Sequence, residues 1–123
     1  MAYRIFMIDD DKFLLDLYAV KFKNAGHEVS VFSGGDEVLK ELRKGEKGPD
    51  AILLDIIMPG MDGLMVLAAI RKEKLAAGSK ILILSNQGAE SDIEKAKALG
   101  ADGYIVKASA IPSEVLAQTI ATL

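Results

Sequence analysis

The chain of 123 residues contains no cysteine, no tryptophan, three prolines and a single histidine. Without cysteine it can form neither disulfides nor thiolate metal sites, which fits a reducing, cytoplasmic location. It has no apolar run long enough to cross a bilayer, and its first residues lack the apolar segment of a secretory signal. Its net charge of -3 gives no electrostatic reason to expect nucleic-acid binding. We therefore expect a cytoplasmic protein that binds neither membranes nor nucleic acid.

Half of the residues are hydrophobic, which is enough for one ordinary globular core. A chain of this length forms one domain and is too short for a second. We therefore expect a single domain over residues 1–123, with no effector domain in the chain.

The most informative stretch is ILLDIIMPGMDG, which begins at Ile52 and ends at Gly63. Its first residues show no polar alternation, which is typical of a strand buried on both faces of a parallel sheet. Asp55 follows at the carboxyl end of this strand, and a Pro-Gly turn comes soon after. Open α/β sheets place their chemistry at the carboxyl ends of their strands. Asp55 is therefore the first candidate for a functional residue.

Strand-like and helix-like patterns alternate along the whole chain. Each short strand-like run is followed by apolar residues at helical spacing. The expected strands cover residues 3–8, 28–32, 52–54, 81–84 and 104–106. Such alternation with short links predicts a doubly wound (βα)₅ fold of the α/β class, with a parallel sheet covered by helices on both faces. Five units are too few for an eight-stranded barrel.

Polar residues in front of the helical patterns predict where the helices begin. Asp11 is expected to cap the first helix and Asp62 the third. Ser33 and Ser91 open S-x-x-D and S-x-x-E patterns, which predict capping boxes for the second and fourth helices. Pro112 is expected in the first turn of the last helix, where its missing N–H is tolerated.

Polar side chains also stand at the carboxyl ends of four strands, where a doubly wound sheet opens onto one crevice. They are Asp9, Asp10 and Asp11 after the first strand, Asp55 after the third, Ser85 after the fourth and Lys107 after the fifth. Clustered carboxylates raise one another's pKa unless a cation lies among them. Oxygen ligands without histidine or cysteine favour Mg²⁺. A carboxylate nucleophile, a metal, a hydroxyl and a lysine suffice for phosphoryl transfer, so the set predicts an acyl phosphate on one aspartate.

The chain resembles the response-regulator receiver domains of two-component signalling over essentially its whole length. The matching residues, in the order and spacing of that family, are Asp9-Asp10, Asp55 with the following Met58–Gly63, Ser85, Gly100–Tyr104 and Lys107. The resemblance implies a flavodoxin-like sheet with strand order 2-1-3-4-5. It also implies that residues 1–123 form a single receiver domain.

The resemblance further implies a role for the acidic residues. Asp55 would accept a phosphoryl group from the phosphohistidine of a sensor histidine kinase or a phosphotransfer protein. Asp10, Asp55 and the backbone carbonyl of Ile57 would bind Mg²⁺ directly, with Asp9 assisting. Such a domain is a signalling switch rather than an enzyme, although it catalyses its own phosphorylation and its slow dephosphorylation.

The hydroxyl and lysine residues receive roles from the same resemblance. Lys107 would bind the phosphoryl group, and Ser85 would turn toward it while Tyr104 moves inward. This change would alter the face built from the fourth helix, fifth strand and fifth helix. That face would then bind a downstream effector protein or fused output domain, or support a phosphorylation-dependent dimer.

The sequence departs from the family pattern around the site. Lys107 is followed by Ala108, where the family usually has proline, often in a cis bond. A cis bond before alanine would cost roughly 3 kcal/mol, so a trans bond and a differently shaped loop are expected. Asn86 is bulkier than the residue often found there, and we expect it to restrict access to the site. Ile57 and Gln87 are expected to influence the lifetime of the phosphoryl group.

Other interpretations of these residues stay open. Asp9-x-Asp11 resembles the nucleophile motif of Mg²⁺-dependent phosphohydrolases of the haloacid-dehalogenase type, although that assignment leaves Asp55 unexplained. The chain could also be a degenerate receiver that binds partners without being phosphorylated. Tyr104 could pack at a strand end without switching. His27 is expected at the surface, with no role in phosphotransfer.

Overall fold

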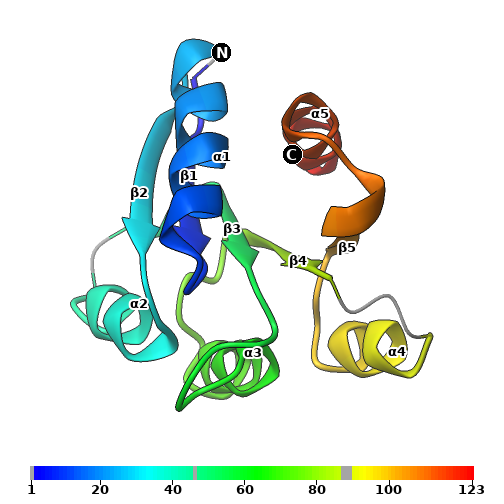
Figure 1. Ribbon diagram of the computed structural model, residues 1–123. Helices are drawn as coiled ribbons and strands as arrows, with labels where there is room; N and C mark the ends of the chain where they lie inside the picture. The colour runs from blue at the N-terminus through cyan, green and yellow to red at the C-terminus, as the bar shows by residue number, and fades with distance from the viewer. Residues whose placement is uncertain (1, 46, 87–89) are drawn as a thin grey trace.

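The structure is a computed structural model that describes residues 2–45, 47–86 and 90–123. Five parallel strands form one sheet in the order β2-β1-β3-β4-β5, and they alternate with α-helices (Figure 1). The strands are β1 (Arg4–Ile8), β2 (Glu28–Phe32), β3 (Ala51–Leu54), β4 (Lys80–Ser85) and β5 (Gly103–Val106). The helices are α1 (Lys12–Asn24), α2 (Gly35–Leu42), α3 (Gly63–Lys72), α4 (Glu90–Ala98) and α5 (Pro112–Thr122), with a 3₁₀ turn η1 (Lys107–Ser109) before α5. The predicted flavodoxin-like α/β fold is confirmed, including its strand order.

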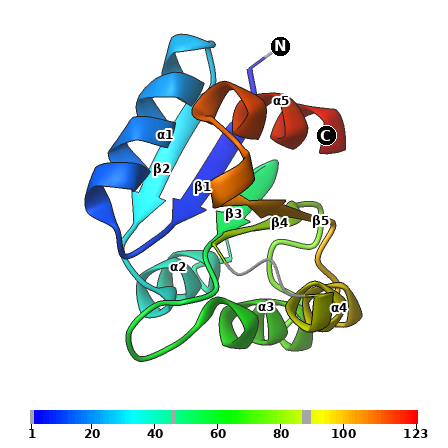
Figure 2. The same ribbon diagram turned by 45° about the vertical axis from the view of Figure 1, so that its right-hand side comes forward.

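The central strands are apolar apart from their end residues, because helices cover both faces of the sheet. Figures 1 and 2 show α1 and α5 on one face and α2, α3 and α4 on the other. Side chains along β3 alternate between the two layers: Ile52 and Leu54 pack toward α2 and α3, whereas Ala51 and Leu53 pack toward α1 and α5. The edge strand β2 is more exposed, as its alternating sequence predicts. Within the described residues, no helix is both long and apolar enough to span a bilayer.

The predicted helix starts are confirmed for α1, α3 and α5 and wrong for α2 and α4. The Asp11 carboxylate accepts a hydrogen bond from the N–H of Leu14, and Asp62 caps α3 in the same way. Pro112 is the first residue of α5. In contrast, α2 begins after Gly34 with no side-chain cap, and the longer Glu37 side chain instead binds the N–H of Ser33 at 2.9 Å. Helix α4 already begins at Glu90, so the serine expected as its cap lies inside the helix.

The turn between β3 and α3 folds tightly back on the end of the strand. The N–H of Gly63 donates to the carbonyl of Ile56 at 2.7 Å. A Cβ atom at position 63 would collide with the backbone carbonyl of Asp55, so the close approach requires glycine. The first residue of α3 is thereby fixed against the strand end that presents Asp55.

Candidate functional site

The polar residues predicted at the strand ends converge on one pocket. A cavity of about 400 Å³ opens at the carboxyl edge of the sheet. Its lining consists of Asp9, Asp10, Asp11, Leu14, Asp55, Ile57, Ser85, Asn86 and Lys107. Residues at the carboxyl ends of β1, β3, β4 and β5, or directly after them, are therefore brought together, although they lie far apart in the sequence.

Three carboxylates of this pocket lie close enough to share a cation. Asp9, Asp10 and Asp55 can each offer one oxygen, and these oxygens lie within 4.8 Å of one another. The pairing of β1 with β3 causes this, because Ile8 lies opposite Leu54 and the two strands continue into Asp9 and Asp55. A cluster of oxygen donors without histidine or cysteine suits a hard divalent cation such as Mg²⁺. The residues present therefore fit the metal that the sequence predicted.

Lys107 crosses the pocket from β5 and contacts two of the carboxylates. Its Nζ donates to Oδ2 of Asp9 at 2.5 Å and lies 3.5 Å from Oδ2 of Asp55. The lysine side chain is only 7% exposed. The other oxygen of Asp9 accepts the N–H of Asp11 at 2.9 Å, so both Asp9 oxygens already have donors. One buried cation thus faces a cluster of three carboxylates, which leaves the pocket negative.

The link between β5 and α5 begins at Lys107. Among the described residues there is no cis peptide bond, which confirms the trans bond expected before Ala108. The 3₁₀ turn η1 begins at Lys107 itself and leads into α5.

The charges in the pocket change the protonation of its buried groups. Burial and the neighbouring charge of Asp9 raise the pKa of Asp55 to about 6, against the opposing effect of Lys107. Burial lowers the pKa of Lys107, but its hydrogen bond to Asp9 and the charge of Asp55 outweigh this and raise the pKa above its ordinary value. Lys107 therefore stays charged, and the ionisation of Asp55 is unfavourable without a further cation.

This predicts a pH-dependent stability difference between wild type and Asp55→Asn. The pKa of Asp55 is raised from 3.8 to about 6 on folding, so its ionisation opposes folding as the pH rises through that range. Asparagine cannot ionise. In metal-free buffer, we expect the variant to melt roughly 3–6 °C above wild type near pH 8, equivalent to about 1 kcal/mol, since solvent at the pocket mouth screens the repulsion. The gain should disappear near pH 4. Thermal melts across this pH range in EDTA measure the difference in melting temperature between the two proteins. A difference that grows toward acid pH would contradict the raised pKa of Asp55.

Ser85 and Tyr104 lie on the same side of the sheet, at the edge of the pocket. Ser85 is buried at the end of β4, and β5 pairs with β4 so that Tyr104 lies opposite Ile83. Burial raises the pKa of the Tyr104 hydroxyl, the charge of Asp92 raises it further, and a hydrogen bond with Ser85 lowers it. The two predicted switch residues are therefore in contact, although Tyr104 does not line the cavity.

The sequence interpretation missed one hydroxyl close to the site. This residue is Tyr18, which is buried on the inner face of α1. Burial raises its pKa, while the charge of Lys107 lowers it and that of Asp9 raises it. The available sequence signal was a tyrosine at helical spacing among apolar residues, which indicates a hydroxyl on the buried face of the helix. Ile57, which was expected to affect the phosphoryl lifetime, and Asn86, which was expected to restrict access, are both exposed and line the pocket. Gln87, the other residue expected to affect the lifetime, lies outside the described residues.

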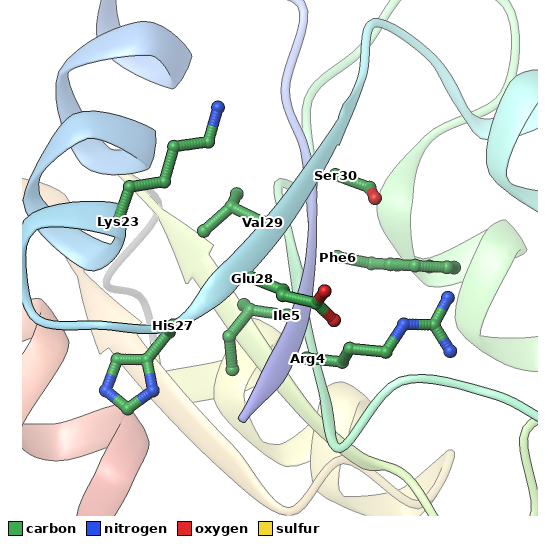
Figure 3. A pocket seen from close by; sticks show the side chains of 8 residues that line it. All are labelled: Arg4, Ile5, Phe6, Lys23, His27, Glu28, Val29 and Ser30. Carbon is green, nitrogen blue, oxygen red and sulfur yellow. The ribbon is translucent and has the colours of Figure 1, made fainter. Parts of the chain in front are cut away.

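A second hollow, of about 480 Å³, lies at the opposite end of the sheet (Figure 3). It surrounds the start of β2, and its polar lining includes Arg4, Lys23, His27, Glu28 and Ser30. His27 is partly buried rather than a simple surface residue, because its Nδ1 accepts the N–H of Tyr3 at 3.1 Å and its ring stacks on the Tyr3 ring. None of the residues at the carboxyl ends of the strands lines this hollow, so it is separate from the acidic pocket.

Comparison with known proteins agrees with this geometry. The family model described as the response regulator receiver domain matches residues 5–120. The chain is 35% identical to the alkaline phosphatase synthesis transcriptional regulatory protein PhoP of Bacillus subtilis over 123 residues, covering 100% of the chain and 49% of that protein. It is 32% identical to the DNA-binding response regulator MtrA of Mycobacterium tuberculosis, again over its whole length and 51% of that protein. The chain thus spans about half the length of these relatives.

Solved structures show the same likeness. The chemotaxis protein CheY4 of Vibrio cholerae superposes with a TM-score of 0.89 at 26% identity, and the match covers 100% of both chains. A CheY-like response regulator receiver domain protein from Methanospirillum hungatei gives a TM-score of 0.84 at 25% identity, covering 96% of this chain and 90% of that one.

Proposed function

The chain belongs to the response regulator receiver domain family, and on that basis we propose that it is a phosphoacceptor switch whose reactive residue is Asp55. The phosphoryl donor would be the phosphohistidine of a sensor histidine kinase or a phosphotransfer protein. An oxygen of Asp55 forms a bond to phosphorus while the P–N bond breaks, and the electron pair of that bond stays on the departing imidazole, which takes up a proton. The observation that carries the proposal is the convergence of Asp9, Asp10, Asp55 and Lys107 in one pocket.

Asp55 suits the nucleophile role better than its neighbours do. Both oxygens of Asp9 already accept hydrogen bonds, from Lys107 and from the N–H of Asp11. Asp11 is engaged as the cap of α1. Asp55 lies in the pocket with a raised pKa, so a cation bound beside it would relieve the repulsion from Asp9 and favour the anionic carboxylate that attacks phosphorus.

The same pocket would hold the metal. Asp10, Asp55 and the backbone carbonyl of Ile57 are the proposed direct ligands. Asp9, which accepts a hydrogen bond from Lys107, would assist them. When bound, Mg²⁺ neutralises charge on the transferring phosphoryl oxygens. Lys107 lies 3.5 Å from Oδ2 of Asp55 and would pair with the phosphoryl group as a point charge.

The change that a downstream partner would recognise is proposed to begin at Ser85 and Tyr104. Ser85 would donate its hydroxyl to the phosphoryl group, which removes it from its hydrogen bond with Tyr104 and lets that ring move inward. The face of α4, β5 and α5 would then bind a downstream effector protein or a fused output domain, or form a dimer. A cytoplasmic location and a single receiver domain over residues 1–123 complete the proposal.

The experiment is to map the modified residue chemically. The chain is incubated with acetyl phosphate and Mg²⁺, the acyl phosphate is reduced with borohydride, and the converted residue is located by peptide mass spectrometry. We expect conversion at Asp55 only, and none when EDTA replaces Mg²⁺. Conversion at Asp9 would instead support a phosphohydrolase of the haloacid-dehalogenase type. No Mg²⁺-dependent conversion at all would support a receiver that works without phosphorylation.

A further inference from the structure

A small cavity lies beside Asp9, on the face of the sheet that α1 and α5 cover (Figure 2). Its volume of about 10 Å³ admits no more than about one water molecule. Five apolar residues line it together with Asp9 and Tyr18. The N–H of Asp9 continues the β1–β2 ladder by donating to the carbonyl of Phe32 at 3.2 Å, so the Asp9 side chain falls on the same side as Met7, two residues earlier. Asp9 and Tyr18 therefore meet on one face of the sheet.

Tyr18 carries a hydroxyl into an apolar layer. The residue is 4% exposed and packs in the core between α1 and the sheet. A phenylalanine ring would fill the same space, so packing accounts for the ring and not for the hydroxyl. Burying a hydroxyl is costly unless a polar partner compensates. The charges of Lys107 and Asp9 both act on the pKa of Tyr18, in opposite directions, which places the hydroxyl within electrostatic reach of this ion pair.

Asp9 depends on Lys107 for one of its two hydrogen bonds. Its Oδ1 accepts the N–H of Asp11, and its Oδ2 accepts Nζ of Lys107. Asp9 is itself only 4% exposed. When Lys107 turns toward a phosphoryl group on Asp55, Oδ2 of Asp9 loses its donor at a place that water hardly reaches. A buried carboxylate oxygen without a partner is costly, so a replacement donor favours the phosphorylated arrangement.

We propose that Tyr18 is a positioning residue, which donates its hydroxyl to Asp9 when Lys107 turns to the phosphoryl group. This inference rests on the proposed function of Asp55 and Lys107. Of the residues that line the small cavity, Tyr18 is the one with a side-chain donor. It is not among the residues that line the acidic pocket, so it acts through Asp9 and touches neither the metal nor the phosphoryl group.

Two other donors lie near Asp9 on its solvent side. Lys12 and Ser33 line a wider cavity of about 320 Å³ that Asp9 also borders. Both residues are exposed, and a surface lysine that pairs with a carboxylate gives up side-chain freedom and hydration for a small gain. Tyr18 is already fixed by the packing of its ring, so its donation requires little further ordering. The core-facing hydroxyl is therefore the favoured replacement.

Binding of beryllofluoride together with Mg²⁺ tests the proposal, because BeF₃⁻ mimics a phosphoryl group on a carboxylate. The variant is Tyr18→Phe, measured by titration calorimetry beside wild type. We expect about tenfold weaker binding of beryllofluoride, equivalent to one hydrogen bond to a charged group. Binding of Mg²⁺ alone should change by less than about twofold, and the melting temperature without ligands should fall by less than about 2 °C. A merely structural role would instead lower the melting temperature and weaken both ligands together.

Two control variants separate the candidate donors. Tyr3→Phe makes the same chemical change in a tyrosine that packs against the same core layer but stacks on His27. Lys12→Met removes the exposed ammonium. Both should bind beryllofluoride as wild type does. Equal binding by Tyr18→Phe and wild type, or a larger loss in Lys12→Met, overturns the inference. Failure of wild type itself to bind beryllofluoride overturns the proposed function, and this inference with it.

NMR of the tyrosine side chains tests the same step without changing the site. The chain has three tyrosines, so ¹³Cζ labelling gives three signals, and the one missing from Tyr18→Phe belongs to Tyr18. The Tyr18 signal should stay in place with Mg²⁺ alone and move when beryllofluoride is added, because its hydroxyl then becomes a donor. The Tyr3 signal should not move. A Tyr18 signal that is unchanged when beryllofluoride binds contradicts the proposal.

Discussion

Asp55→Asn is expected to lose Mg²⁺-dependent phosphorylation completely. The amide has nearly the same shape and can keep the position of the side chain, but it offers no anionic oxygen to attack phosphorus. It also removes one of the three carboxylates that would hold the metal. Intact-protein mass spectrometry after incubation with acetyl phosphate measures the loss, and the variant should remain at the level of the EDTA control.

Asp11→Asn is the matched control for this experiment. Asp11 lines the same cavity, but its carboxylate caps α1 by accepting the N–H of Leu14. Asparagine caps helices about as well as aspartate, so the fold should not suffer. The control should be phosphorylated to nearly the wild-type level. Persistent labelling of Asp55→Asn would show that a different carboxylate is the acceptor.

Lys107→Met is expected to destabilise the metal-free protein by about 3 kcal/mol near neutral pH, because removing one partner of a buried ion pair leaves uncompensated charge. Methionine replaces most of the apolar stem of the lysine, so the loss reports on the ammonium group. Asp9 and Asp55, which the ammonium contacts, are both buried. Urea denaturation in EDTA measures the difference from wild type.

Added Mg²⁺ distinguishes charge compensation from a simple loss of contacts. A divalent cation held by the same carboxylates supplies the missing positive charge, so the destabilisation of Lys107→Met should shrink at saturating Mg²⁺. Lys12→Met is the control, since Lys12 is an exposed lysine at the same edge of the sheet and should change stability by less than about 0.5 kcal/mol. A Lys107→Met deficit that Mg²⁺ does not alter would argue against a metal site at these carboxylates.

The fold was predictable because its signals are local. The two-residue period of β2, set against the uniformly apolar β3 and the apolar run 81–84 of β4, distinguishes an edge strand from buried ones. Strand order is different, since it depends on which strands meet in three dimensions, and here it followed only from the family resemblance. Helix starts were predictable where a side chain caps directly, as with Asp11. The prediction was wrong at Ser33, where the side chain of Glu37, one residue beyond the expected partner Asp36, accepts the backbone N–H.

The site was predictable as a set of residues but not as a set of contacts. The rule that parallel strands end at one edge brings Asp9, Asp55, Ser85 and Lys107 together. Which carboxylate Lys107 prefers depends on the path of the η1 turn, which no sequence pattern specifies. The exposed apolar side chains of α1 were also hidden, because α1 is apolar on more than one face and only the folded structure shows which face is buried.

The Lys107–Asp9 bond has a further consequence for the way the chain is made. Its partners are separated by 98 residues, so one end of the bond emerges from the ribosome almost a whole domain before the other. Until β5 is in place, the carboxylates that follow β1 and β3 lack the ammonium group of Lys107. Asp55, the proposed phosphoacceptor, therefore gains its contact with Lys107 only when the segment that follows β5 has joined the sheet.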